Sequence, residues 1–110
     1  MITTYLGLGA NLGTPSTTLA RCLGELSQLP FSRLSRWSRP WHTPPWGETQ
    51  QAEFLNLAVE LKTGLAPLVL LQHLLGIERR LGRRRNGQRW GPRLIDTDLL
   101  MSVSYTHLTL

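Results

Sequence analysis

The chain has 110 residues, 41% of them hydrophobic, which fits one domain with a modest core. Its net charge is +5 and almost all of the positive charge is arginine, since Lys62 is the only lysine. Such a charge suits nucleotides, nucleic acid or plain solvation, and composition does not separate them. The single cysteine, Cys22, excludes an intrachain disulfide, and neither a signal peptide nor a membrane-spanning stretch is visible. We therefore expect a small soluble cytoplasmic domain.

The first half of the chain predicts two strands and a helix between them. An apolar run from Thr3 to Leu8 predicts a buried strand, followed by a turn over residues 9–13. Leucines and Cys22 recur at helical spacing, which predicts an amphipathic helix with Pro15 at its first position and an end near Pro30. Weak alternation predicts a strand over residues 31–38, and the prolines after it predict a loop over residues 39–51.

The second half predicts the same three kinds of element again. Residues 54–61 alternate, with four apolar residues on one strand face and Phe54, Asn56, Ala58 and Glu60 on the other. A second helix is expected from Ala66-Pro67 to Gly82, then an arginine-rich loop over residues 83–92 and a last strand over residues 94–101. The order β-α-β-β-α-β predicts an α+β fold, a ferredoxin-like sandwich with an antiparallel sheet and both helices on one face.

Asp96 and Asp98 are the strongest candidates for chemistry. Two positions apart in a strand, their carboxylates share one face about 6.5–7 Å apart along the chain. Such a pair repels unless a cation joins it, and oxygen ligands with phosphate suit Mg²⁺. The alternative is two solvated carboxylates on an edge strand, but the apolar Leu94, Leu99 and Leu100 around them favour burial. We expect a metal site that neutralises charge in phosphoryl transfer.

Seven arginines lie within residues 79–93, directly before these carboxylates. The guanidinium fork binds phosphates and carboxylates with two hydrogen bonds. The candidate phosphate ligands are Arg83, Arg85, Arg89 and Arg93, whereas Arg79, Arg80 and Arg84 are expected to be solvated. Trp90 either stacks on a planar ring or covers the loop.

A second constellation suits a flat heterocycle. Residues 43–47 form a proline-stiffened turn, and Phe54 and Asn56 project from one strand face, offering a ring to stack and an amide to donate and accept. The alternatives are an ordinary loop and core packing of Phe54. Residues 7–13 are glycine-rich after a strand, but they lack the spacing of a dinucleotide-binding fingerprint and are interpreted as a turn.

Four segments in this order resemble the hydroxymethyldihydropterin pyrophosphokinases of folate biosynthesis, over residues 2–101. They are Leu8-Gly9-Ala10-Asn11-Leu12, Thr43-Pro44-Pro45, Phe54-Leu55-Asn56, and Arg89-Trp90-Gly91-Pro92-Arg93 with Asp96-Thr97-Asp98. The resemblance implies transfer of pyrophosphate from ATP to a pterin hydroxymethyl group, giving AMP. It also implies two Mg²⁺ ions bridged by Asp96 and Asp98.

The resemblance also assigns the other residues. The pterin would lie against Thr43, Pro44, Pro45, Trp46, Phe54 and Asn56. Catalytic contacts would come from Arg83, Arg93, Asp96 and Asp98, and the nucleotide region from Glu78, Arg85, Arg89 and Trp90. Small molecules are the expected partners, with no nucleic acid, no membrane and a monomeric chain.

The chain departs from the family at three places. Thr97 stands where an aliphatic residue is usual, and Trp46 replaces a smaller apolar residue. Residues 102–110 no longer resemble the family and look like translated sequencing-adapter read-through, which predicts an incomplete domain over residues 1–101. Two alternatives follow. One is an inactive fragment that keeps the pterin pocket. The other is a nucleic-acid-binding module, which requires exposed aromatic residues and no acids on the open sheet face.

Overall fold

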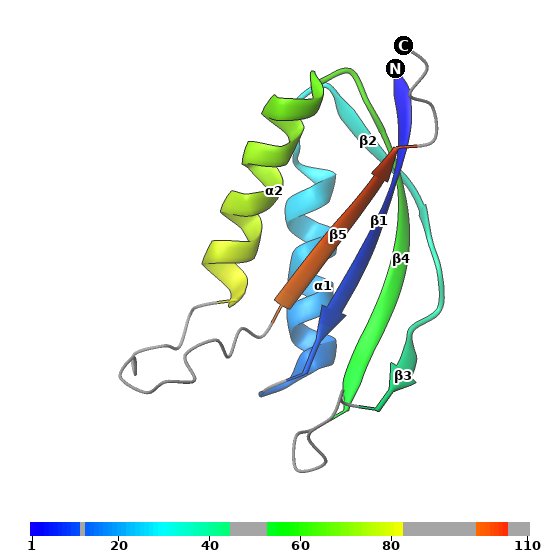
Figure 1. Ribbon diagram of the computed structural model, residues 1–110, viewed down its shortest axis with the longest axis vertical. Helices are drawn as coiled ribbons and strands as arrows, with labels where there is room; N and C mark the ends of the chain where they lie inside the picture. Colours follow the sequence, from blue (N-terminus) through cyan, green and yellow to red (C-terminus); the bar gives the residue numbers. More distant parts are fainter. Residues whose placement is uncertain (12, 45–52, 83–98, 106–110) are drawn as a thin grey trace.

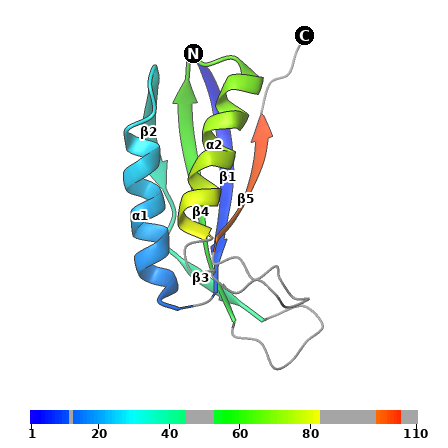
Figure 2. The same cartoon turned by 90° about the vertical axis from the view of Figure 1, so that its left-hand side faces the viewer.

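The computed structural model describes residues 1–11, 13–44, 53–82 and 99–105. These described residues form five strands and two helices: β1 Ile2–Ala10, α1 Pro15–Ser27, β2 Ser32–Trp37, β3 Trp41–Thr43, β4 Phe54–Thr63, α2 Pro67–Gly82 and β5 Leu99–Tyr105. All strand pairs are antiparallel, in the order β2-β4-β1-β5, and the short β3 also pairs with β4 (Figure 1). Both helices cover the same face of the sheet: they lie to the left of the strands in Figure 1 and in front of them in Figure 2. The predicted α+β ferredoxin-like architecture is confirmed.

The two helices form where the apolar spacing predicts them. Pro15 is the first residue of α1, where its missing N–H leaves no hydrogen bond unmade, and Leu19, Cys22 and Leu26 are the buried residues of this helix. The helix ends at Ser27, three residues before the expected end at Pro30. Helix α2 starts at Pro67 and ends at Gly82, as predicted to within one residue.

The core lies between the helices and one face of the sheet. Strand β4 turns Leu57, Val59 and Leu61 inward, which confirms the alternation predicted for it. Each such side chain contributes about 1.5–3 kcal/mol by leaving water. The other buried apolar residues come from four elements: Leu6, Leu8, Ala10, Leu19, Cys22, Leu26, Leu70, Leu74, Ile77, Leu81 and Leu99, with Leu29 just beyond α1.

Four strand predictions need correction. Strand β1 continues to Ala10, because residues 9 and 10 pair with β4 on one side and β5 on the other. The expected loop over residues 39–51 contains β3, and β4 runs two residues further, to Thr63. The last strand was expected over residues 94–101. Residues 94–98 lie outside the described chain, and β5 continues to Tyr105, which pairs with Thr4.

Within the described ranges, neither helix has the length and apolar character to cross a membrane.

Candidate functional site

A polar cluster lies on the open face of the sheet, where β1 ends and β4 begins. Its centre is Asn56, whose Nδ2 donates to Thr43 Oγ1 at 3.0 Å and to the backbone oxygen of Trp41 at 3.2 Å. Both amide protons are therefore engaged by β3, and Oδ1 is held as a hydrogen-bond acceptor. Together with Phe54 and Gly9, these residues are called the Asn56 cluster below.

Gly9 leaves room for the Asn56 amide beside the backbone of β1. A Cβ at this position would lie 3.3 Å from Asn56 Oδ1, which is a tight contact, and 3.5 Å from Phe54 Cδ1, which is an ordinary van der Waals contact. Without a Cβ, the Asn56 amide can approach the backbone of β1 closely, beside the Phe54 ring. Gly9, predicted to belong to a turn over residues 9–13, is therefore a residue of β1 with a role in the site.

The cluster offers three chemical groups to one ligand. Phe54, Asn56 and Thr43 are half-buried, so each has one side available, and they provide an aromatic ring, a fixed amide oxygen and a hydroxyl. Pro44, directly after Thr43, is exposed. A planar heterocycle with N–H groups on its edge matches this set, because stacking and edge hydrogen bonds act at right angles to each other.

The structure does not bring Glu78 to this cluster. Glu78 belongs to α2 on the covered face of the sheet, and its carboxylate accepts a hydrogen bond from the backbone N–H of Met101 at 3.3 Å. That bond pairs an amide of β5 with α2 rather than with another strand. The predicted nucleotide-binding role of Glu78 stays a prediction.

Arg79 and Arg80 are both exposed, as expected. Arg80 is not only solvated, however: it also forms an ion pair with Glu25, which links α2 to α1. Exposed pairs of this kind typically contribute about 0–1 kcal/mol.

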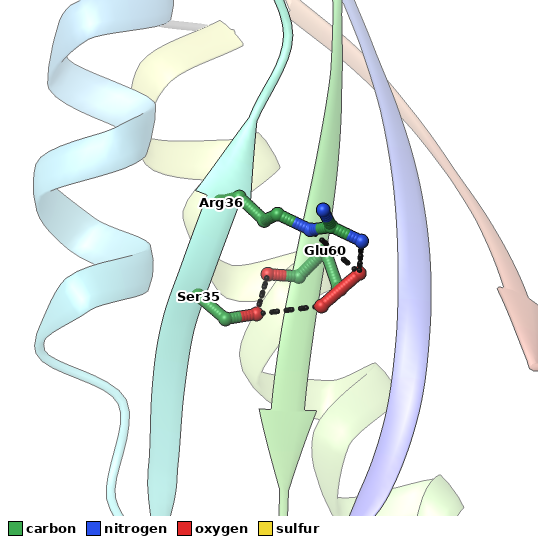
Figure 3. A network of polar contacts seen from close by, with 3 residues as sticks. All are labelled: Ser35, Arg36 and Glu60. Atoms are coloured by element: carbon green, nitrogen blue, oxygen red, sulfur yellow. Dashed lines mark hydrogen bonds and ion pairs between the residues drawn. The ribbon is translucent and has the colours of Figure 1, made fainter.

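A second polar network joins β2 to β4 on the open face (Figure 3). Arg36 donates from Nε and Nη2 to Glu60 Oε1 at 3.1 and 3.0 Å, and Ser35 Oγ lies 3.0 Å from Glu60 Oε2. The Arg36 hydrogen bonds, helped by Ser35, lower the pKa of the Glu60 carboxyl, and the same bonds raise the pKa of Arg36. The network therefore holds a charged carboxylate, 9% exposed, in the middle of the sheet.

The remaining predicted site residues lie outside the described residues: Pro45, Trp46, Arg83, Arg85, Arg89, Trp90, Arg93, Asp96 and Asp98. The described elements next to these segments nevertheless meet at one end of the sheet. Leu99, the first residue of β5, pairs with Ala10, which pairs with Leu55 beside the Asn56 cluster. Gly82 ends α2 toward this same end of the sheet (Figure 1).

No group of three or more His, Cys, Asp or Glu side chains that could hold a metal occurs in the described ranges. The Mg²⁺ assignment therefore depends on Asp96 and Asp98, which lie outside them. Two carboxylates two positions apart are an oxygen donor set that suits this ion.

Comparison with known proteins decides the family. The model of the family 7,8-dihydro-6-hydroxymethylpterin-pyrophosphokinase (HPPK) matches residues 5–110. The chain belongs to the HPPK family. This confirms the resemblance stated from the sequence motifs.

Curated relatives of the HPPK family agree. The chain is 47% identical over 100 residues to a 2-amino-4-hydroxy-6-hydroxymethyldihydropteridine pyrophosphokinase of Methylorubrum extorquens, covering 91% of this chain and 63% of that protein. Proteins of the same name from Bacillus subtilis and Haemophilus influenzae are 42% and 40% identical. Those matches cover 88% and 92% of this chain, and 58% and 62% of the relatives. The chain thus spans about three-fifths of the length of the relatives it matches.

Proposed function

We propose that this chain carries the pterin-binding part of an enzyme that transfers pyrophosphate from ATP to 6-hydroxymethyl-7,8-dihydropterin, giving AMP. Family membership and the names of the relatives support the reaction. The single observation that carries the pterin assignment is the Asn56 cluster, in which β3 accepts both amide protons and the amide oxygen is left as an acceptor beside Gly9.

The cluster would bind the pterin by its ring and its edge. Phe54 would stack against the flat bicycle, and Asn56 Oδ1 would accept from an N–H of the ring edge. Thr43 Oγ1 already accepts from Asn56, so its own proton is directed to a different acceptor, which the pterin edge can supply. Pro44, Pro45 and Trp46 would form the rim. These contacts would orient the hydroxymethyl group toward the nucleotide.

The transfer itself requires positioning and charge neutralisation. The hydroxymethyl oxygen forms a bond to the β-phosphorus of ATP, and the bond from that phosphorus to the α,β-bridging oxygen breaks. AMP leaves with the bridging oxygen, and the hydroxyl proton passes to solvent. Bound Mg²⁺ would neutralise the phosphate charge, with Asp96 and Asp98 as its ligands and two ions expected.

The arginines would act on the same phosphates. Arg83 and Arg93 would contact the transferred group, while Arg85, Arg89, Trp90 and Glu78 would line the nucleotide. A cytoplasmic location and a monomeric state remain part of this proposal.

The nucleic-acid alternative meets one of its two requirements. Tyr5 is an exposed aromatic residue on the central strand β1. However, Glu60 occupies the adjacent position of β4 on the same face, paired with Arg36, where that alternative requires no acid.

The test is an assay of AMP formation. The chain is incubated with ATP, Mg²⁺ and 6-hydroxymethyl-7,8-dihydropterin, and compared with a chain carrying Asp96→Ala and Asp98→Ala. We expect AMP from the first and none from the second. Equal AMP from both refutes the metal assignment, and pterin binding with no AMP from either supports the inactive fragment.

A further inference from the structure

The alignment of β2 and β3 against β4 contains two extra residues. Strand β2 begins regularly, with Ser32 opposite Thr63 and Leu34 opposite Leu61. The next pair is Arg36 with Glu60, so Ser35 is one residue too many for β4. This position is a β-bulge or a similar irregularity of the pairing.

The second extra residue lies in the connection from β2 to β3. Trp37 is opposite Val59, and Trp41 is opposite Asn56. Between these two pairs the chain advances four residues from β2 to β3, but only three residues along β4. One residue of the connection, which begins at Ser38, has no partner in β4.

These two insertions decide which side chain meets Asn56. With neither insertion, the regular pairing of β2 would continue and place Arg39 opposite Asn56. With the first alone, Pro40 would face Asn56 and His42 would face Phe54, which exchanges the two faces of β3. Only with both does Trp41 lie opposite Asn56 and Thr43 opposite Phe54, where the Thr43 hydroxyl reaches the amide.

At each insertion, a serine forms hydrogen bonds to β4. Ser35 Oγ lies 3.1 Å from the backbone oxygen of Glu60 and 3.0 Å from its carboxylate, as Figure 3 shows. Ser38 donates its N–H to the Ala58 oxygen at 2.9 Å, and its Oγ accepts from the Ala58 N–H at 3.0 Å. The Ser38 hydroxyl thus replaces the carbonyl that a regular strand would offer to β4.

We propose that Ser38, together with Ser35, is a positioning residue that sets the register of β3 and so assembles Thr43 and Asn56 into one binding surface. Its consequence for pterin affinity rests on the proposed function. Removing the Ser38 hydroxyl leaves the Ala58 N–H without its acceptor. The register with the inserted residue then loses the hydrogen bond that stabilises it over the regular register.

The experiment compares three variants of the full chain. Ser38→Ala removes the acceptor and Ser38→Thr retains a hydroxyl. Ser32→Ala is the matched control, since Ser32 also belongs to β2 and its Oγ lies 2.7 Å from Thr63 Oγ1, but in the regular stretch. Two quantities are measured: cross-strand proton contacts by NMR between Trp41 and Asn56 and between Thr43 and Phe54, and calorimetric affinity for 6-hydroxymethyl-7,8-dihydropterin.

We expect Ser38→Ala to lose the two cross-strand contacts and to bind the pterin about tenfold more weakly. Ser38→Thr should restore both, and Ser32→Ala should keep both even where it lowers the unfolding temperature. Ser35→Ala gives an independent test of the first insertion by the same contacts. Retained contacts in Ser38→Ala and Ser35→Ala overturn the inference. If the unchanged chain binds no pterin, the proposed function fails, and the contacts alone decide the inference.

Discussion

At Asn56 a single carboxamide joins three strands, because it bonds to Thr43 and Trp41 of β3 and lies against Gly9 of β1. The sequence predicts part of this arrangement. Period-two alternation places Phe54 and Asn56 on one face, since successive side chains of a regular strand point to opposite faces. Gly9 and the Trp41 carbonyl were missed. Backbone acceptors leave no mark in a sequence, but the alternation of Gly7 and Gly9 with buried Leu6, Leu8 and Ala10 could have indicated a small-residue face.

Cys22 is predicted to be inert in the folded chain. Burial, and secondarily the charges of Glu25 and Glu78, raises the pKa of its thiol from 9.0 to about 12. At pH 8 the thiolate fraction falls by roughly a thousandfold, so labelling by a thiol reagent should be very slow until denaturant is added. Because the folded pKa is raised, this thiol contributes stability that is complete below pH 9 and is lost as the pH rises toward about 12. Equal labelling rates with and without denaturant would contradict this prediction.

Thr4 offers a prediction on stability. Its side chain is fully buried, and Oγ1 has no hydrogen-bond partner among the described residues. Thr4→Val keeps the shape and removes a desolvated hydroxyl, so the free energy of unfolding should rise by about 1 kcal/mol. The matched control is Thr63→Val. The buried Thr63 hydroxyl forms hydrogen bonds with Ser32 and with the Leu65 N–H, so its removal should lower the free energy of unfolding. Denaturant titration that ranks the two variants the other way would refute this explanation.

At the scale of elements, periodicity predicts both helices and misjudges the strands. A helix of 13 or 16 residues repeats its apolar spacing several times, so α1 and α2 were located to within a few residues. Strand β3 has three residues and follows Pro40, which leaves too short a pattern to detect. The insertion at Ser35 also breaks the alternation of β2, and the one after Trp37 shifts β3 relative to β2. Their positions are fixed by hydrogen bonds to β4 that lie far away in sequence.

The ion pair between β2 and β4 should make stability depend on pH. Since Arg36 lowers the folded-state pKa of Glu60, the pair contributes stability above the ordinary carboxyl pKa and loses it as the pH falls through the folded value. Arg36→Met should therefore lower the urea midpoint at pH 7, and the difference from the unchanged chain should shrink toward pH 3. Arg21→Met, an exposed arginine of α1, serves as the control. A difference that stays constant with pH would show that the charge is not responsible.

At the scale of the whole molecule, the elements that carry the candidate site lie at one end of the sheet. The Asn56 cluster, the start of β5 and the end of α2 lie there, so the segments predicted to bind phosphate and metal are attached next to the predicted pterin surface. The fold class could be predicted because element order and helix amphipathicity suffice for it. The arrangement of residues 83–92 could not be predicted, because a polar segment without periodicity carries no local signal. The predicted domain boundary at residue 101 stays a prediction.

The most direct test of the account is a calorimetric titration of 6-hydroxymethyl-7,8-dihydropterin into the unchanged chain, Asn56→Ala and Gln72→Ala. Gln72 is an exposed carboxamide on α2 and controls for the loss of an amide group elsewhere. We predict that Asn56→Ala weakens binding about tenfold or more while Gln72→Ala leaves it unchanged. Binding that is equally tight in all three chains, with circular dichroism showing each of them folded, would contradict the assignment of the Asn56 cluster to the pterin.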